Sequence, residues 1–330
     1  MGKPHFDWID YAKGIAILLV AIGHAFPDAS ALGGVQNEYL RMFRDVIYQF
    51  HMPLLFFISG MLTGKVLRLE TVTDRYGYVK DRAKRLLLPY ISVAVVYLPF
   101  KVVLSSFANQ PYDITGLWKI ILGENPDGGL WFLYALFLIQ STMCFFVSKK
   151  NLAVSLFVSV VIAILIVWMD TKWYWVDDAF FYMCFVIAGL WYAKSSLFNK
   201  PINLLYIMVF LALFIVSLTV FLMTKSPYCK LSSGFLGSLL VIGISKMIVT
   251  GNAISGVLKS LGQYTMDIYI FHGILMVVAR ILFYSIFGWN YYLCCAIMLM
   301  VGLIMPFVIS KYLVRPVPLF RKLFLGEFDG

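Results

Sequence analysis

The sequence predicts an all-α polytopic membrane protein with about ten transmembrane helices. Of its 330 residues, 61% are hydrophobic and 13% are charged, whereas soluble domains average roughly 45–50% and about 25%. The apolar residues form long continuous runs, and about 20 such residues cross the hydrocarbon core of a bilayer. Continuous runs exclude a β-barrel, whose strands alternate apolar and polar residues. No hydrophilic stretch is long enough for a soluble enzyme domain on a single membrane anchor.

Ten apolar runs predict the transmembrane helices in their order along the chain. The second run contains His51 and Pro53, and only Lys149, Lys150 and Asn151 separate the fourth run from the fifth. No internal repeat or linker divides the chain, so we expect one integral-membrane domain over residues 1–330 without a fused soluble domain. The predicted crossings are 9–27, 44–64, 86–107, 130–148, 151–168, 178–196, 202–223, 231–250, 263–285 and 290–311.

The placement of Lys and Arg predicts the orientation of these helices. With the N-terminus inside, ten crossings put 19 of the 27 basic residues on the cytoplasmic side. For a net charge of +10, placement matters more than the sum, and this asymmetry predicts that both termini are cytoplasmic and that the number of crossings is even. The exceptions are Arg41, Arg44, Lys101, Lys119, Lys172, Lys225, Lys230 and the intramembrane Arg280.

A cleaved signal peptide is the alternative interpretation of the N-terminus. Residues 15–22 would be its apolar core, and Ala29-Ser30-Ala31 would be its cleavage site. Asp7 and Asp10 make the leading segment acidic, whereas a signal peptide begins with positive charge. We therefore expect the first helix to be part of the folded protein.

The five cysteines predict neither a disulfide framework nor a metal site. Their number is odd and their spacing matches no metal-binding pattern. Four of them lie inside apolar runs, where a thiol usually behaves as a small buried hydrophobic group. Cys229, outside these runs, leaves the question of a disulfide partly open.

Lys13 and His24 are two ionisable residues of the first predicted helix, and such residues inside a membrane are functional candidates. Their separation of eleven residues corresponds to about 20° beyond three full turns, so they share one face about 16 Å apart. Asp10 lies three residues before Lys13 on that face and can pair with it. The alternative is a lysine that snorkels to the cytoplasmic surface and a histidine that simply ends the helix.

His51 lies in the second predicted helix, within the segment YQFHMPLLFFISG. If that helix starts near residue 44, His51 is about 10 Å deep from the outer end and can face one outer cavity with His24. The alternative is a histidine bonded to the backbone carbonyl that Pro53 leaves free. Ser59 and Gly60 continue the helix and favour close packing against a neighbour.

His272 lies about nine residues into the ninth predicted helix, near the middle of the membrane. Asp267 precedes it by five residues, or about 140° around the helix, so the two do not share a face. A buried histidine that pairs with a neighbouring helix and a catalytic histidine are equally good interpretations of this position.

A basic segment from Lys65 to Arg85, expected to be a cytoplasmic loop, precedes the third predicted helix. Arg82 and Arg85 are three residues apart at the expected start of that helix, where they can jointly bind a phosphate group. The alternatives are ordinary positive-inside charge and binding of anionic lipid headgroups.

Five segments in this order resemble the membrane-bound acyltransferase family 3, in particular its branch similar to fucose 4-O-acetylases. The resemblance runs from residue 9 to about residue 273. The segments are IDYAKGIAILLVAIGH (9–24), FHMPLLFFISG (50–60), RAKRLLLPY (82–90), LWFLYALF (130–137) and GQYTMDIYIFHG (262–273).

The resemblance implies roles for individual residues. The family's basic residue and histidine, separated by ten residues, correspond to Lys13 and His24; many members have Arg in place of the Lys. The family's Arg-x-x-Arg pair, associated with the acyl-CoA phosphates, corresponds to Arg82 and Arg85. Many members carry a fused soluble hydrolase-like domain that this chain lacks, so we expect the membrane domain itself to acylate the final acceptor.

The function implied is a membrane-bound O-acyltransferase, located in the inner (plasma) membrane of a bacterium. It would move an acetyl or other short acyl group from cytoplasmic acyl-CoA to a hydroxyl of a glycan or lipid-linked sugar. Acetyl-CoA is then a co-substrate. We expect no permanently bound cofactor, no metal and no nucleic-acid partner, and membrane lipids as surroundings. The basic segment lies on the expected side for the anionic coenzyme.

The candidate catalytic residues are His24, His51, Lys13 and Asp10, with His24 as general base. His51 would orient the acceptor or protonate the thiolate, and Lys13, held by Asp10, would fix the donor or the helix. Arg82, Arg85 and Lys13 are the donor-binding candidates. Further candidates for substrate contact are Trp131, Tyr264, His272 and Ser59.

Two other classes of protein compete with the enzyme. An exporter or flippase for an anionic glycan or lipid precursor also uses many helices, intramembrane histidines and a basic face. No inverted repeat and no matching pair of Gly/Pro-broken helices supports that class. A purely structural membrane protein explains neither the shared face of Lys13 and His24 nor the histidines.

Overall fold

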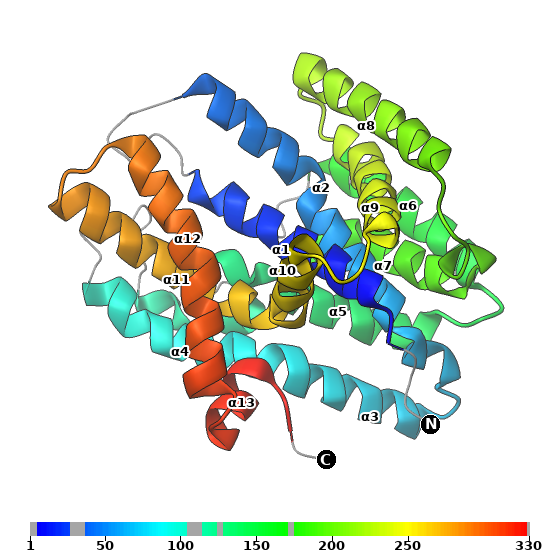
Figure 1. Ribbon diagram of the computed structural model, residues 1–330. Helices are drawn as coiled ribbons and strands as arrows, with labels where there is room; N and C mark the ends of the chain where they lie inside the picture. The colour runs from blue at the N-terminus through cyan, green and yellow to red at the C-terminus, as the bar shows by residue number, and fades with distance from the viewer. Residues whose placement is uncertain (1–4, 27–36, 104–113, 124–127, 171–174, 329–330) are drawn as a thin grey trace. The chain divides into compact units, whose positions relative to one another are not determined.

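The computed structural model describes residues 5–26, 37–103, 114–123, 128–170 and 175–328, and within these ranges every regular element is helical (Figure 1). Nine helical stretches in the described ranges are long and apolar enough to cross a membrane. The predicted all-α polytopic membrane fold is therefore confirmed. The side of the membrane on which each terminus lies, and the organisation as a single domain, remain predictions.

Ten described helices occupy the positions of the ten predicted crossings. They are α1 (Asp7–Ala25), α2 (Glu38–Leu62), α4 (Leu88–Val103), α5 (Trp131–Phe146), α6 (Leu152–Met169), α7 (Trp175–Lys194), α8 (Leu204–Thr224), α9 (Cys229–Met247), α11 (Thr265–Arg280) and α12 (Tyr291–Ile309). Three further helices are α3 (Val72–Arg82), α10 (Ala253–Gln263) and α13 (Pro318–Leu325). The ends of the first and third predicted crossings, and the motif Ala29-Ser30-Ala31, lie outside the described residues.

Helix α9 lies at a predicted crossing, but it is not among the nine described stretches that are long and apolar enough to cross a membrane. Its sequence is rich in serine and glycine, and Ser233, Gly234, Gly237 and Ser238 are all buried. The hydroxyl of Ser238 donates to the carbonyl of Gly234, so this polar group is satisfied within the helix. Small residues at a helix–helix interface permit close packing in place of an apolar surface.

Helix α2 starts six residues before the predicted start, at Glu38. The side chain of Asn37 accepts a hydrogen bond from the backbone N–H of Leu40 (3.1 Å), which is an N-cap interaction. His51 consequently lies about 20 Å from the start of the helix. The predicted start near residue 44 is therefore wrong, because hydropathy locates the apolar run and not the cap, whereas the depth of His51 in the membrane stays a prediction.

The segment before residue 86 is helical, and the prediction of a basic loop there is wrong. The Asp74 carboxylate accepts from the backbone N–H of Thr71 (3.0 Å), and the Thr71 hydroxyl accepts from the N–H of Asp74 (3.1 Å). This reciprocal capping starts α3, a polar helix. A π-helical segment, Ala83–Leu87, then joins α3 to α4 without a break, so Arg82 and Arg85 do not stand at a helix start.

The helices form two compact units, each drawn from several segments of the chain. Unit 1 contains residues 1–20, 45–75 and 139–265, and unit 2 contains residues 21–44, 76–138 and 266–330. Helix α1 contributes residues 7–20 to unit 1 and residues 21–25 to unit 2.

In unit 1, glycines bring helix backbones into direct contact. A Cβ atom at Gly60 of α2 would overlap the carbonyl oxygen of Val186 on α7, and one at Gly189 of α7 would overlap that of Phe57 on α2. Each of the two crossing helices, α2 and α7, therefore contributes a glycine at a position where any side chain would clash with the other helix. The close packing predicted at Gly60 is confirmed.

The same arrangement joins α1 to α10 in unit 1. A Cβ at Gly14 would overlap the carbonyl oxygen of Leu258, and a Cβ at Gly262 would overlap that of Asp10. An ion pair of 2.8 Å between Asp7 Oδ1 and Lys259 Nζ adds to this crossing. Hydrogen bonding to the Asp7 carboxylate raises the pKa of Lys259 above its ordinary value.

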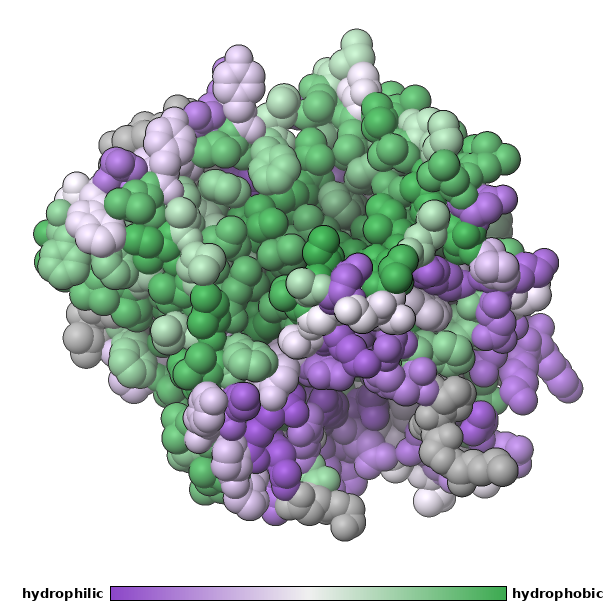
Figure 2. Space-filling view, in the orientation of Figure 1, coloured by the Kyte–Doolittle hydropathy of each residue, from purple (hydrophilic) through white to green (hydrophobic). Residues whose placement is uncertain are grey.

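The outward-facing side chains of α6 and α8 are strongly apolar. On α8, Leu205 and Met223 are 66% and 81% exposed, and on α6 Phe157 is 70% exposed. Figure 2 shows hydrophobic side chains over much of α8 and α12, whereas hydrophilic side chains gather around α13. Exposed apolar area on this scale is stable only against lipid or another apolar surface.

In unit 2, the end of α1 packs against α11 and α12. The contact is a small-residue cluster whose buried members are Ala21, Ala25, Met276, Ala279, Cys294 and Met298.

All five cysteines of the chain are free and buried, in agreement with the expectation of no disulfide framework.

Candidate functional site

The imidazole rings of His24 and His272 lie against each other in unit 2. Their centroids are 5.1 Å apart and their planes meet at 87°, an edge-to-face contact. His24 is half-buried near the C-terminal end of α1, and His272 is 2% exposed in the middle of α11. The contact of His24 with His272 was not predicted from the sequence, and the expected outer cavity shared by His24 and His51 stays a prediction.

The hydrogen bonds of His272 determine which of its nitrogens carries the proton. Nδ1 lies 2.8 Å from the carbonyl oxygen of Tyr269 and 3.1 Å from that of Ile268. Since a carbonyl oxygen can only accept, Nδ1 bears the hydrogen and Nε2 keeps its lone pair. Nε2 is buried and has no hydrogen-bond partner among the described residues. His272 therefore presents a bare acceptor in the part of unit 2 that contains His24.

Tyr269 links His272 to the start of α5. Its hydroxyl donates to the backbone carbonyl of Gly129, and its ring lies 5.4 Å from that of Phe132 and 5.9 Å from that of His272. The segment containing the candidate residue Trp131, which is half-buried, is thereby held beside the histidine segment. Sequence analysis did not select Tyr269, although its position three residues before His272 puts it on the same helix face.

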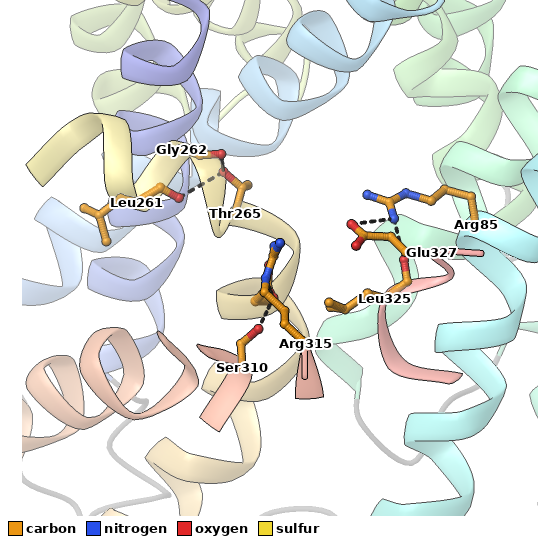
Figure 3. A network of polar contacts seen from close by, with 9 residues as sticks. Arg85, Leu261, Gly262, Thr265, Ser310, Arg315, Leu325 and Glu327 are labelled. Atoms are coloured by element: carbon orange, nitrogen blue, oxygen red, sulfur yellow. Dashed lines mark hydrogen bonds and ion pairs between the residues drawn. The ribbon is translucent and has the colours of Figure 1, made fainter. Parts of the chain in front are cut away.

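Asp267 anchors α11 to the end of α12. Its carboxylate accepts from Arg315 Nε (3.0 Å) and Arg315 Nη2 (2.8 Å), and also from the hydroxyl of Ser310. Asp267 is fully buried, and Figure 3 shows Ser310 and Arg315 side by side within this network. Asp267 thus contacts the π-helical extension of α12 and the residue directly after it, while His272 contacts α1, as expected for two residues on different faces.

Lys13 and Asp10 form the predicted ion pair in unit 1. Lys13 Nζ lies 2.6 Å from Asp10 Oδ1, and Asp10 is 3% exposed. His5 Nε2 lies 3.0 Å from the other carboxylate oxygen of Asp10. Because α1 runs unbroken from Asp7 to Ala25, Lys13 and His24 remain on one helix face about 16 Å apart.

His51 is buried within unit 1 in the middle of α2. Its Nδ1 donates to the carbonyl oxygen of Ile47 (2.9 Å), and its ring lies 5.0 Å from that of Tyr48. The carbonyl bonded is that of Ile47, whereas the missing N–H of Pro53 frees that of Gln49. As in His272, the proton is on Nδ1 and the lone pair is on Nε2.

Ser59 and Tyr264 also belong to unit 1. The carbonyl of Ser59 accepts from the hydroxyl of Thr63 (2.7 Å), and Ser59 itself is half-buried beside Gly60. The backbone N–H of Tyr264 donates to the carbonyl of Ser260 (3.1 Å), which ends α10. Of the candidate residues, unit 2 holds His24, His272, Trp131, Arg82 and Arg85, and unit 1 holds Asp10, Lys13, His51, Ser59 and Tyr264.

The two arginines of the basic segment have different surroundings in unit 2. The guanidinium of Arg82 lies over the ring of Tyr78, 5.2 Å from its centroid, and its buried Nε has no hydrogen-bond partner among the described residues. Arg85 contacts the C-terminal end of α13 and the chain after it: Nη1 donates to the carbonyl of Leu325 (2.6 Å) and to Glu327 Oε1 (3.1 Å). Figure 3 shows the Arg85 guanidinium directed at these two acceptors.

The fold and these polar groups define an integral membrane protein with paired histidines among its transmembrane helices and arginines at a helix junction. In the described part of the chain, no group of three or more His, Cys, Asp or Glu side chains is placed to hold a metal ion. The sequence profile of the family described as "Acyltransferase domain" matches residues 6–309, which is nearly the whole chain. The chain therefore belongs to this family, acyltransferase family 3.

Two similar proteins are both named "Nodulation protein NolL". The one from Sinorhizobium fredii (strain NBRC 101917 / NGR234) is 33% identical over 129 residues, which are 38% of this chain and 32% of that protein. The one from Mesorhizobium japonicum (strain LMG 29417 / CECT 9101 / MAFF 303099) is 30% identical over 131 residues, 39% of this chain and 32% of that protein. The matched part thus spans about a third of either relative. No solved structure matches the chain.

Proposed function

We propose that the protein transfers an acetyl or other short acyl group from cytoplasmic acyl-CoA to a hydroxyl of a glycan or lipid-linked sugar. The observation that carries this proposal is the contact between His24 and His272. A half-buried imidazole lies beside a second imidazole whose bare nitrogen is held in a fixed orientation. Ionisable side chains in such surroundings are costly, which favours a role in chemistry.

His24 acts in this proposal as the general base. The acceptor hydroxyl loses its proton to His24 while its oxygen attacks the thioester carbonyl carbon, and the carbon–sulfur bond then breaks. The coenzyme leaves as a thiolate, which takes up a proton to give free CoA, and the acceptor leaves as an ester. Proton transfer by a positioned base contributes typically about 10²–10⁴-fold to the rate.

His272 has a positioning role in this scheme. Its ring packs against His24, and its bare Nε2 accepts a hydrogen bond from an N–H or O–H group of the bound substrate. Removal of this acceptor leaves a substrate donor unsatisfied in an apolar region, which costs about 1–3 kcal/mol. Tyr269 and Asp267 fix α11 and thereby the orientation of the His272 ring.

The remaining candidates take supporting roles. Arg82 and Arg85 bind the phosphates of the donor, because arginine forms strong charge-assisted hydrogen bonds with phosphate. Lys13, fixed by Asp10, orients the donor or α1, and His51 orients the acceptor or protonates the thiolate. In a bacterial inner membrane the cytoplasmic basic segment would meet the anionic coenzyme directly.

The test is turnover of acetyl-CoA by the purified protein in lipid nanodiscs. Release of CoA and transfer of radiolabelled acetyl to a glycan acceptor would be measured for wild type, His24→Ala and Arg82→Ala/Arg85→Ala. We expect turnover by wild type, donor binding without turnover by His24→Ala, and loss of donor binding by the double variant. If wild type neither binds acetyl-CoA nor releases CoA, acyl-CoA is not the donor and transport of a glycan precursor is tested next.

A further inference from the structure

The chain following α13 lies directly on the backbone of the Lys84–Arg85 segment. Helix α13 ends at Leu325, and Gly326 adopts a left-handed conformation with φ of 61°. A Cβ at Gly326 would lie 2.5 Å from the carbonyl oxygen of Lys84 and 2.7 Å from the Cα of Arg85. Both the backbone conformation and the close approach therefore require glycine. We refer to residues 325–327 as the C-terminal strap.

The strap binds one nitrogen of the Arg85 guanidinium. The Leu325 carbonyl and Glu327 Oε1 both accept from Nη1, at 2.6 and 3.1 Å. Next to this contact, Lys84 Nζ lies 5.2 Å from the centroid of the Phe328 ring. The Arg85 side chain is 37% exposed and that of Glu327 is 35% exposed, so the pair remains in contact with solvent.

The opposite edge of the guanidinium, formed by Nε and Nη2, has no hydrogen bond in the described part of the chain. This edge presents two parallel N–H groups, which match two oxygens of one phosphate group. A long arginine side chain otherwise samples many rotamers, and two acceptors on Nη1 restrict it to one orientation. The strap thus leaves the phosphate-binding edge free while it fixes the rest of the group.

We propose that the C-terminal strap positions Arg85 to bind a phosphate of acyl-CoA, with Glu327 as the main positioning residue. The inference rests on the proposed function, because it requires a phosphate-bearing donor. It adds a specificity element that is more than 240 residues from Arg85 in the sequence and outside the segments that resemble the family. The strap would favour complete coenzyme A over acyl thioesters without phosphate.

The test compares two donors, acetyl-CoA and acetylpantetheine, the latter of which carries the same thioester arm without phosphates. In nanodiscs, Glu327→Ala should raise KM for acetyl-CoA about tenfold, the effect of losing one charged hydrogen bond. Its kcat with acetyl-CoA and its KM for acetylpantetheine should not change. Glu327→Gln, which keeps an acceptor oxygen, should recover most of the affinity. Calorimetric binding of CoA gives the same comparison without turnover.

Glu38→Ala is the matched control, because Glu38 forms another exposed ion pair within unit 2, 3.8 Å from Arg41. It should leave both KM values unchanged. If Arg85→Ala weakens acetyl-CoA binding and Glu327→Ala does not, or strengthens it, the strap does not position Arg85 and the inference is overturned. If wild type binds neither CoA nor acetyl-CoA, the proposed function itself is overturned.

Discussion

The two units hold their helices together by different means. In unit 1, backbones touch at Gly14, Gly60, Gly189 and Gly262, where a methyl group would already overlap a carbonyl oxygen. In unit 2, an apolar cluster and the close approach of Gly326 are accompanied by three polar joints: the Asp267 carboxylate binds Arg315, the Tyr269 hydroxyl binds a backbone carbonyl, and Glu327 binds Arg85.

The difference indicates where chemistry can take place. Backbone contact through glycine is nonpolar and depends on shape alone, so it fixes helices without providing reactive groups. A polar contact between helices requires that polar groups lose their hydration, which costs free energy. Natural membrane proteins retain such contacts mainly where they serve a function. The three described π-helical segments, Ala83–Leu87, Ile281–Ile286 and Ser310–Val314, also belong to unit 2, and such segments frequently accompany functional sites.

The largest expected effect of a single substitution is on catalysis in unit 2. His24→Ala should lower turnover about 10²–10⁴-fold, because the proposed general base is lost. Its melting temperature should stay near that of wild type, since His24 is only half-buried and alanine favours helix. Radiolabelled acetyl transfer and thermal unfolding in detergent provide the two measurements. A variant within tenfold of wild-type turnover contradicts the role of His24.

The next effect concerns the polar joint at Asp267. Asp267→Ala removes the acceptor of two Arg315 hydrogen bonds and should lower the free energy of unfolding by about 3 kcal/mol. Denaturant titration measures this loss. In a double-mutant cycle, Arg315→Ala should cost little once Asp267 is absent, and additive losses would show that the pair does not act as a unit.

A glycine substitution in unit 1 should affect stability without affecting chemistry. Gly60→Ala forces α2 away from α7 and should cost about 1–3 kcal/mol, while turnover per folded molecule stays the same. Gly77→Ala is the matched control, because no atom lies within 4 Å of its added Cβ. Since alanine favours helix, this control should gain up to about 1 kcal/mol in α3. Equal losses in both variants would remove the distinction between the units.

The smallest effect is expected at the exposed ion pair of unit 1. The pKa of Lys259 is raised in the folded state by Asp7, so its contribution to stability is present below its ordinary pKa of 10.5 and is lost as the pH rises through the folded-state value. Lys259→Ala should therefore change the melting temperature only slightly at pH 7 and should flatten its decline at alkaline pH. Melting curves at several pH values measure this difference.

The sequence predicted the helices far better than their contacts. Each of the ten apolar runs coincides with a described helix, because an apolar run must be buried in lipid or protein. All of these helices except α9 belong to stretches long and apolar enough to cross a membrane. Hydropathy missed the starts of α2 and α3, where the caps at Asn37 and Thr71 extend the helix into polar sequence. Because Asn37 and Thr71 are residue types that commonly cap helices, the sequence itself carries a signal for both helix starts.

Among the contacts of the candidate residues, the sequence predicted the local pair of Lys13 and Asp10 but not the distant pairs. Both histidines of the pair were selected as intramembrane ionisable groups, yet the contact between His24 and His272 joins helices almost 250 residues apart, and no local pattern encodes it. The contact of Arg85 with Glu327 is equally distant, with a sequence separation of 242 residues. By contrast, the position of Tyr269 next to His272 on the same helix face follows from helical spacing alone.

The hydrogen bond at Nδ1 of His272 makes the two ring nitrogens chemically different. Because Nδ1–H is tied to backbone carbonyls of its own helix, the two nitrogens cannot exchange roles unless that bond breaks. An electrophile that reaches this residue would therefore alkylate Nε2 alone. In a ¹⁵N spectrum the ring would show a single tautomer in place of the averaged signals of a freely exchanging imidazole.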